Sequence, residues 1–338
     1  MLKKNLFLLI CFFSIIEVFG QNFEIVPSNE KFQTNLRAIA KNKSLFYALG
    51  SKSGLVYGPV GSLKNNYMQY AANGIINDWR SAHLRKNNDL VFINVGPPAY
   101  FCYLNHLTNK ISISLIDSSK GVFVDGLVFI NDKTGVAFGD PQNGKMPLWK
   151  TTDGGQRWEK YFGAEMADDE AAFAASNTSI ATNFKNKILI VTGGSQSRIL
   201  ISDNKGLTFF PSPLPIAQGK ATQGAYSVDI WGDCIAVAGG DYSAPESNDG
   251  NFCISFDGGK NFTKATKGPS GYKSCVKFMD KKRLIAVGTT GVDVSTDGGM
   301  NWKHLDDSPF NSIGVINKKQ AILAGPEGKI ALLNVTKR

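Results

Sequence analysis

Three carboxylic acids in this sequence are of the type that could perform acid–base chemistry. Asp140 and Asp241 each follow a short apolar run that ends in glycine, and Glu170 lies in an acidic stretch between those runs. Cleavage of a glycosidic bond needs two carboxyl groups on either side of that bond, roughly 5 to 10 Å apart. We therefore take Asp140, Glu170 and Asp241 as candidate catalytic residues. The other interpretation, which we favour, is that an Asp after a strand-ending Gly caps its own loop.

A second group of side chains could bind a ligand without transforming it. Arginine, carboxylate and tyrosine side chains around one funnel suit a carbohydrate or a peptide terminus. Ordinary packing with solvated cations is the alternative. A sialidase needs three arginines for its substrate's carboxylate, and the sequence offers two suitably placed ones. The ligand-binding candidates are Arg37, Arg80, Asp125, Tyr226, Tyr242, Tyr272 and Lys273.

A repeated turn motif indicates the architecture that positions these residues. The motif reads Ser/Thr-x-Asp/Asn-x-Gly-x-x-Trp/Phe and suits a tight turn between antiparallel strands. The Asp or Asn oxygen caps backbone N–H groups, the Gly adopts positive φ, and the aromatic residue starts the next strand facing a core. We expect a structural role for these turns, on the mouth that faces away from any ligand. Their Asp and Asn positions are Asp153, Asn204, Asp257 and Asp297.

An independent marker, a short apolar run ending in glycine, recurs at intervals of 37 to 54 residues. Seven such units at this period predict an all-β fold, a seven-bladed β-propeller formed by residues 21–338 as one domain. The last blade lacks a fourth strand, and we expect residues 23–27 to supply it and close the ring. The longest predicted helix, residues 163–175, would lead into the inner strand of blade 4 near Ala172. The glycines are Gly50, Gly96, Gly139, Gly193, Gly239, Gly288 and Gly325.

The motifs at residues 151–155 and 295–299, with the blade order around them, resemble those of the Asp-box (BNR-like) propellers. The chain looks most like the seven-bladed photosystem II assembly and stability factors and their non-photosynthetic bacterial relatives. Asp-box propellers include sialidases, other glycosidases, sorting receptors and assembly factors, so the resemblance implies the fold and not the function. The bacterial relatives are often labelled oxidoreductases or glycosyl hydrolases, and no motif here supports either label. The departures from the motif are Asn204, Phe209 and Phe262.

The N-terminus predicts export. Lys3 and Lys4 precede an apolar run, and residues 1–20 are typical of a secretory signal peptide with cleavage before Gln21. We expect no stable membrane insertion after cleavage. The formal net charge of +9 favours acidic partners, but without a long basic run we do not expect nucleic-acid binding.

No cofactor or metal is predicted. The sequence has no G-x-G-x-x-G after a strand, and its cysteines and histidines lack the spacing of a zinc site. Export would permit a disulfide between Cys234 and Cys253, but apolar surroundings favour buried thiols for Cys102, Cys234, Cys253 and Cys275. The sequence thus predicts an exported, non-catalytic propeller that acts as a binding or assembly scaffold for an envelope protein or glycan. The alternative is a glycoside hydrolase, sialidase-like or other, that uses the carboxylates named above.

Overall fold

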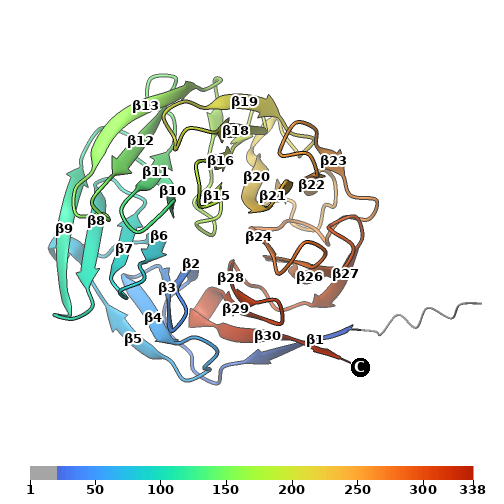
Figure 1. Cartoon of the computed structure of the whole chain (residues 1–338), viewed down its shortest axis with the longest axis horizontal. Coiled ribbons are helices and arrows are strands. Elements are labelled where there is room, and N and C mark those ends of the chain that lie inside the picture. The colour runs from blue at the N-terminus through green and yellow to red at the C-terminus, as the bar shows by residue number, and fades with distance from the viewer. Residues whose placement is uncertain (1–20, 338) are drawn as a thin grey trace, which may run out of the picture.

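The computed structural model describes residues 21–337, which form seven sheets arranged as blades around a central axis (Figure 1). All paired strands within each blade are antiparallel, and within residues 21–337 helix is confined to two short 3-10 turns, η1 (Ala72–Gly74) and η2 (Pro326–Gly328). The predicted all-β, seven-bladed propeller is confirmed. The predicted signal peptide, residues 1–20, lies outside the described residues.

The first three blades have four strands each, numbered outward from the axis. Blade 1 contains β2 (Leu36–Lys41), β3 (Leu45–Gly50), β4 (Gly54–Pro59) and β5 (Asn66–Gln69). Blade 2 contains β6 (Trp79–Leu84), β7 (Leu90–Asn94), β8 (Ala99–Asn105) and β9 (Lys110–Asp117). Blade 3 contains β10 (Val124–Phe129), β11 (Gly135–Gly139), β12 (Lys145–Thr151) and β13 (Glu159–Glu165).

The next three blades repeat the pattern, with one extension. Blade 4 contains β15 (Ile180–Thr182), β16 (Ile188–Val191), β18 (Arg198–Ser202) and β19 (Phe210–Pro213). Blade 5 contains β20 (Lys220–Trp231), β21 (Cys234–Asp241), β22 (Phe252–Ser255) and β23 (Thr263–Lys264), and its sheet is extended by β17 (Gly193–Gly194) and β14 (Glu170–Ala171). Blade 6 contains β24 (Cys275–Phe278), β25 (Leu284–Gly288), β26 (Gly291–Ser295) and β27 (Trp302–Asp306).

Blade 7 is built from both ends of the chain. Its inner strands are β28 (Ser312–Asn317), β29 (Gln320–Ala324) and β30 (Ile330–Lys337). The fourth strand is β1 (Gln21–Pro27), which pairs with β30 from Gln21 opposite Lys337 to Pro27 opposite Ala331. The predicted closure of the ring by an N-terminal strand is confirmed, and it covers an edge that would otherwise be open to pairing.

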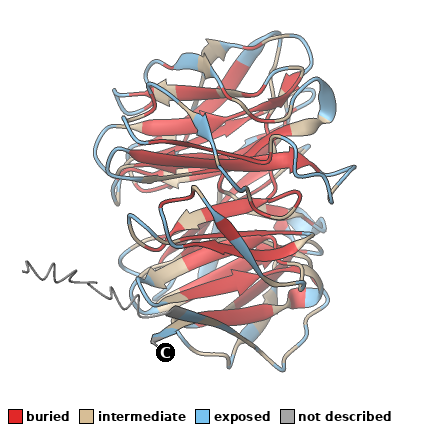
Figure 2. Cartoon of the chain, turned by 90° about the vertical axis from the view of Figure 1, so that its right-hand side faces the viewer, coloured by how far each residue is buried: buried red, intermediate tan, exposed pale blue. Residues whose placement is uncertain are grey.

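The hydrophobic core lies in layers between neighbouring blades. Phe138 and Leu148 of blade 3, for example, pack with Ile188 and Leu200 of blade 4, and all four are fully buried. Figure 2 shows buried residues along the strands, while exposed residues gather at the turns and loops. Since each fully buried side chain of this size contributes about 1.5–3 kcal/mol, these layers hold the ring together. The loops and turns that connect the strands form the two faces of the ring, at either end of the central axis.

The helix expected over residues 163–175 is wrong. This region instead contains the end of β13 and the two-residue strand β14, and the inner strand of blade 4 begins at Ile180 rather than near Ala172. Residues 172–179, here named the axial segment, cross the centre of the ring. Alanine content favours a helix locally, but Ser and Thr hydroxyls bond to backbone groups of other blades, and those contacts prevail.

Contacts of the axial segment reach most of the ring. Ser176 Oγ donates to the Ser274 carbonyl of blade 6 at 2.7 Å, and Ser312 Oγ of blade 7 donates to the Ser176 carbonyl at 3.2 Å. Asn177 Nδ2 donates to the Ala82 carbonyl of blade 2 at 2.9 Å. The small side chains of this segment allow its backbone to occupy the narrow axis. The channel of this propeller is therefore filled by its own chain at this level.

Candidate functional site

Four of the predicted ligand-binding residues occupy equivalent positions in four blades. In each of β2, β6, β10 and β20 one residue is left without a partner in the second strand of the blade. Such a β-bulge re-aims the side chain of the extra residue. The bulged residues are Arg37, Arg80, Asp125 and Tyr226.

The strand-ending glycines accommodate these bulges. A Cβ on Gly50 would lie 2.1 Å from the Asn35 carbonyl oxygen, and one on Gly139 would lie 2.0 Å from that of Phe123. Gly239 has the same relation to Gly224, at 1.9 Å. Real Cβ atoms do not approach an oxygen so closely, so glycine is needed at this point in blades 1, 3 and 5, whereas in blade 2 the bulge lies next to Asn94. In blades 1, 3 and 5 the glycine that marks the repeat in the sequence thus also makes room for the bulged site residue.

The bulged side chains form a charged cluster at the mouth of the channel opposite the repeated turns, here named the charged mouth. Arg80 pairs with Asp78 at 2.6 Å and donates through Nη1 to the Ala174 carbonyl of the axial segment at 3.1 Å. Burial and the neighbouring Arg80 lower the pKa of Arg37, with opposing contributions from Tyr272 and Asp78. Two guanidinium groups therefore lie close together in a partly desolvated place.

Asp125 and Asp140 share this mouth as a coupled pair. Asp125 is fully buried, and its pKa is raised well above the usual value by burial and by the Asp140 carboxyl. Burial also raises the pKa of Asp140, against a hydrogen bond from the Ala172 N–H at 3.0 Å. Two interacting carboxyl groups in a buried place do not readily both lose their protons. The pair therefore holds a proton at pH values where an exposed Asp would have lost it.

Aromatic side chains flank the charged cluster. The ring of Tyr226 stacks on Phe173 of the axial segment with centroids 3.8 Å apart and meets Tyr272 edge-on at 4.8 Å. Tyr226 also contacts Tyr242, whose ring is half exposed. Burial raises the pKa values of Tyr226 and Tyr272, so both phenols stay neutral. The mouth combines an aromatic wall with two arginines and three carboxyls.

Glu170 and Asp241 have partners of their own. The Glu170 carboxylate is contacted by Arg198 Nη2 at 2.5 Å and accepts a hydrogen bond from Thr192 Oγ1 at 2.6 Å. Asp241 accepts from the N–H and Oγ of Ser243 at 2.9 and 2.6 Å, which caps its own loop. Burial acts to raise the pKa of Asp241, but hydrogen bonds led by that of Ser243 Oγ lower it to about 2.

The strand order also separates these two acids. Glu170 on β14 and Asp241 at the end of β21 lie three strands apart in one sheet, about 14 Å at ordinary strand spacing. Asp140 faces Asp125 instead of either of them. The structure thus brings together Asp125 and Asp140, a pairing that the sequence did not suggest, and leaves Glu170 and Asp241 in separate networks.

Lys273 lies inside blade 6. Its ammonium contacts Asp293 at 2.6 Å and donates to Thr290 Oγ1 at 3.0 Å, with both members of the ion pair almost fully buried. Asp78, Phe173 and the axial segment were not predicted. Asp78 lies two residues before the predicted Arg80, and Phe173 falls within the residues for which a helix was expected.

The four repeated turns lie at the opposite mouth, the turn face. At the turn after β26, Asp297 Oδ1 accepts from the N–H groups of Met300 and Asn301 at 3.1 and 3.0 Å, and Ser295 Oγ accepts from Gly299 N–H at 3.0 Å. Gly299 has φ 93°. The turns after β12 and β22 show the same hydrogen bonds, and the Asn204 turn shows them in part. These side chains are engaged in local backbone bonding.

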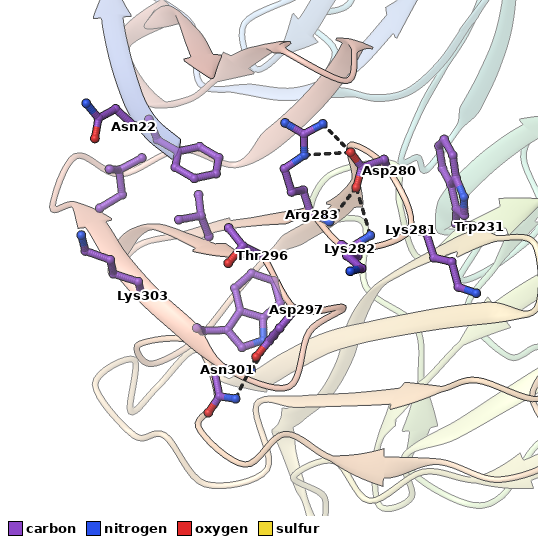
Figure 3. Close-up of a pocket in the computed structure, with 14 residues that line it drawn as sticks. Asn22, Trp231, Asp280, Lys281, Lys282, Arg283, Thr296, Asp297, Asn301 and Lys303 are labelled. Carbon is purple, nitrogen blue, oxygen red and sulfur yellow. Dashed lines mark hydrogen bonds and ion pairs between the residues drawn. The ribbon is translucent and has the colours of Figure 1, made fainter. Parts of the chain in front are cut away.

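Two sizeable cavities also open on the turn face. One, of about 930 Å³, is lined by the β24–β25 turn, Trp231 and the Asp297 turn (Figure 3). The other, of about 900 Å³, lies at the end of the channel between Lys41, Phe129 and Phe184. There His83 stacks on Phe129 at 4.3 Å, and burial lowers the pKa of His83 to about 4. The sequence had placed ligand binding at the charged mouth alone.

Within residues 21–337 no cluster of His, Cys, Asp and Glu has the geometry of a metal site. Cys102, Cys234, Cys253 and Cys275 are buried free thiols, as the apolar runs around them predicted. The same residues contain no helix long and apolar enough to cross a bilayer.

The chain is similar to known proteins in structure, but its sequence matches no known family. No protein-family model matches the chain, and no curated protein does. The chain is similar to the structure of YCF48 bound to D1 peptide, with a TM-score of 0.66, 11% identity and coverage of 93% of this chain and 97% of the other. YCF48 from Cyanidioschyzon merolae gives a TM-score of 0.64 and 12% identity, over 92% of this chain and 98% of the other.

Propellers of other kinds match comparably well. The WD40 repeats of RRP9 give a TM-score of 0.64 at 9% identity, over 92% of this chain and 97% of the other. Likeness at this level of identity shows the seven-bladed fold alone.

Proposed function

We propose that this propeller is a non-catalytic scaffold that binds a protein segment of the cell envelope at its charged mouth. The observation that carries the proposal is the convergence of four bulged inner-strand residues from blades 1, 2, 3 and 5 on one mouth. Buried polar atoms there lack protein partners among the described residues, namely Arg37 Nε, Asp78 Oδ1 and both carboxyl oxygens of Asp125. Buried polar atoms of this kind need a partner, and a bound peptide can supply it.

The chemistry of the mouth suits a peptide with an anionic group. Arg37 and Arg80 offer two neighbouring guanidinium groups, which bind a carboxylate with directed N–H bonds. Phe173, Tyr226 and Tyr242 offer an aromatic wall for an apolar side chain next to it. The similar fold of YCF48, seen with D1 peptide, supports peptide binding as a use of this architecture. A glycan would use the same aromatic and charged groups and is the other ligand class that we consider.

Capture from an envelope fraction tests the scaffold proposal. We expect the wild-type chain to enrich one envelope protein and the Arg37→Gln, Arg80→Gln variant to lose it, with at least a tenfold weaker Kd for that protein, about what the loss of one charge-assisted contact gives. Arg157→Gln, at the turn face, is the matched control and should bind as wild type. Equal capture by the charged-mouth variant would refute the proposal.

A second candidate function is glycoside hydrolysis. The Asp125–Asp140 pair favours it, because a carboxyl whose pKa is raised above the usual value can act as a general acid. The residues proposed from the sequence for this chemistry are Asp140, Glu170 and Asp241. Turnover on a broad glycan panel that disappears in an Asp140→Asn variant of unchanged fold would favour the hydrolase, and no turnover by the wild type would end it.

We also propose that the chain is exported, to the periplasm or beyond, on the basis of its N-terminal sequence. Cell fractionation with mass spectrometry of the mature N-terminus tests this point. The expected mature protein starts at Gln21, which is the first residue of β1.

A further inference from the structure

Large apolar side chains are exposed at successive turns of the turn face over blades 4 and 5. Phe184 follows β15 and is 72% exposed, and Leu207 follows β18 and is 63% exposed. Trp231 is the last residue of β20 and is 44% exposed, and Phe256 follows β22 and is 51% exposed. We name these four side chains the tip residues. Together they expose more apolar surface than folding requires.

Hydrogen bonds between the turns hold the tip residues on one surface. Lys205 N–H donates to the Asn186 carbonyl at 2.8 Å, which joins the two turns of blade 4. Lys187 Nζ donates to the Gly258 carbonyl at 3.2 Å, and Gly258 N–H donates to the Asp233 carbonyl at 2.9 Å. The turns of blades 4 and 5 therefore form one continuous patch. The groove of Figure 3 continues it from Trp231 to blade 6.

Folding does not account for Phe184. Its φ is 58°, in the left-handed region that bulky residues avoid, and this conformation costs about 1–3 kcal/mol. Because most of the Phe184 ring is exposed, its burial contributes too little stability to offset this strain. Gly or Asn would form the same turn with less strain. An exposed aromatic residue held in a strained turn is better explained by contact with something outside the chain.

The patch is basic as well as apolar. Its acids are largely engaged, since Asp203 pairs with Lys187 at 3.3 Å, Asp280 pairs with Arg283, and Asp257 caps its own turn. Within the described residues no ion pair forms at four neighbouring lysines. They are Lys185, Lys205, Lys281 and Lys282.

Charge also differs between the two faces. In the turns of the turn face Lys and Arg outnumber Asp and Glu, whereas in the loops at the charged mouth the acids are in the majority. A molecule with this distribution presents its turn face to an anionic surface. β1 starts on the same side, because Gln21 pairs with Lys337 at the turn-face end of β30.

From this arrangement we propose that the turn face of blades 4 to 6 docks the propeller on an anionic lipid bilayer. A protein–protein interface has an apolar centre from which charged residues are depleted, but here lysines alternate with single exposed apolar tips. Alternating Lys and Phe, Leu or Trp is what an interfacial membrane surface accepts, with rings among the headgroups and lysines against lipid phosphates. This docking leaves the charged mouth facing away from the lipid.

Trp231 provides a direct measurement. The chain has five tryptophans, of which Trp231 is the exposed one and Trp302 lines the same groove, so a fluorescence change on lipid addition that is absent from a Trp231→Phe variant reports on Trp231. The test uses the chain as isolated, with vesicles of phosphatidylcholine alone or mixed with phosphatidylglycerol. We expect co-sedimentation with the mixed vesicles only, weakened by salt, and quenching of Trp231 by brominated acyl chains.

Variants separate the apolar and basic contributions. Phe184→Ser with Phe256→Ser should lower the partition coefficient at least about tenfold. Lys281→Glu with Lys282→Glu should lower it by about tenfold or more and abolish the preference for phosphatidylglycerol. The matched controls lie away from the turn face, Ile76→Ser for an exposed apolar side chain and Lys120→Glu for a basic one. Both controls should bind as wild type.

The proposal fails if the wild type does not bind mixed vesicles, if Trp231 is not quenched, or if variants and controls bind alike. Circular dichroism and melting temperature establish that each variant is folded. Should the double Phe variant unfold, the lysine pair decides the question, because these side chains sit in an exposed turn. Envelope-protein capture by the charged mouth is independent of every one of these results.

Discussion

At the residue scale, the surroundings of the Asp125 carboxyl disfavour its charged form. Its position on the bulge of β10 buries it completely, and a second carboxyl, that of Asp140, lies nearby. Burial disfavours the charged form, and so does a nearby negative charge. The folded protein is therefore more stable when the Asp125 carboxyl is protonated than when it is ionised. A group of this kind makes the free energy of unfolding depend on pH.

We expect Asp125→Asn to stabilise the protein at neutral pH. The folded-state pKa of Asp125 is raised, so the wild type loses stability as pH rises from about 4, the unfolded value, through the folded value. Asn stays neutral, so the variant's advantage should grow with pH to about 1 kcal/mol or more. Urea unfolding across acidic to neutral pH measures it. An advantage that does not change with pH would contradict the shared proton.

Asp297 illustrates a purely structural carboxylate. We expect Asp297→Ala to lower the free energy of unfolding by about 1 kcal/mol, because two backbone N–H groups lose their acceptor. Ligand binding at the charged mouth should be unchanged. Thermal melting and a binding titration measure the two effects. A stable Asp297→Ala protein that had lost its ligand would show that this turn is part of a site.

Single strands decide where the candidate site residues point. A bulge in each of β2, β6, β10 and β20 aims one side chain toward the mouth, and a glycine at the end of the second strand makes space for three of these bulges. Each of these four blades thus places one candidate side chain at the charged mouth. Changing the glycine should disturb the neighbouring strand and the site together.

We expect Gly139→Ala to destabilise the protein by about 2–3 kcal/mol, since the new Cβ would overlap the Phe123 carbonyl oxygen. Relief of that overlap would move Asp125 and so alter the Asp125–Asp140 pair. Gly144→Ala in the following loop is the control. It has open space around it and should cost about 1 kcal/mol for its positive φ alone. Equal losses from both variants, in chemical denaturation, would argue against the packing role of Gly139.

The whole molecule is held closed by strand β1. Phe23 and Ile25 of that strand pack against the core of blade 7, and its backbone covers the edge of β30. An uncovered edge strand invites pairing with other chains. The ring also carries opposite charge excess on its two faces, which is a property of the assembled molecule and of no single blade.

Removal of β1 should open the ring. A chain beginning at residue 28 is expected to lose about 3 kcal/mol or more of stability, from the apolar burial of β1 side chains, and to self-associate through β30. A chain beginning at Gln21 is the control and should stay monodisperse with an unchanged melting temperature. Light scattering with calorimetry distinguishes the two. A stable, monomeric product of the larger deletion would show that closure is dispensable.

The sequence by itself determined the repeat, the seven blades and the closing strand. Apolar period, strand-ending glycines and turn chemistry are local signals, and each blade repeats them. It also indicated candidate site residues such as Arg37, Arg80 and Asp125, because they are polar residues near the starts of predicted inner strands.

Only the tertiary structure decided how those residues combine. The Asp125–Asp140 pair of blade 3, the separation of Glu170 from Asp241 in the sheet of blade 5, and the burial of Lys273 against Asp293 in blade 6 depend on strand order, bulges and packing within the folded blades. The axial segment had the local composition of a helix, and its hydroxyl contacts with blades 5, 6 and 7 overrode that preference. Local propensity differs by less than 1 kcal/mol per residue between most side chains, so contacts between residues far apart in sequence prevail where the ring brings them together.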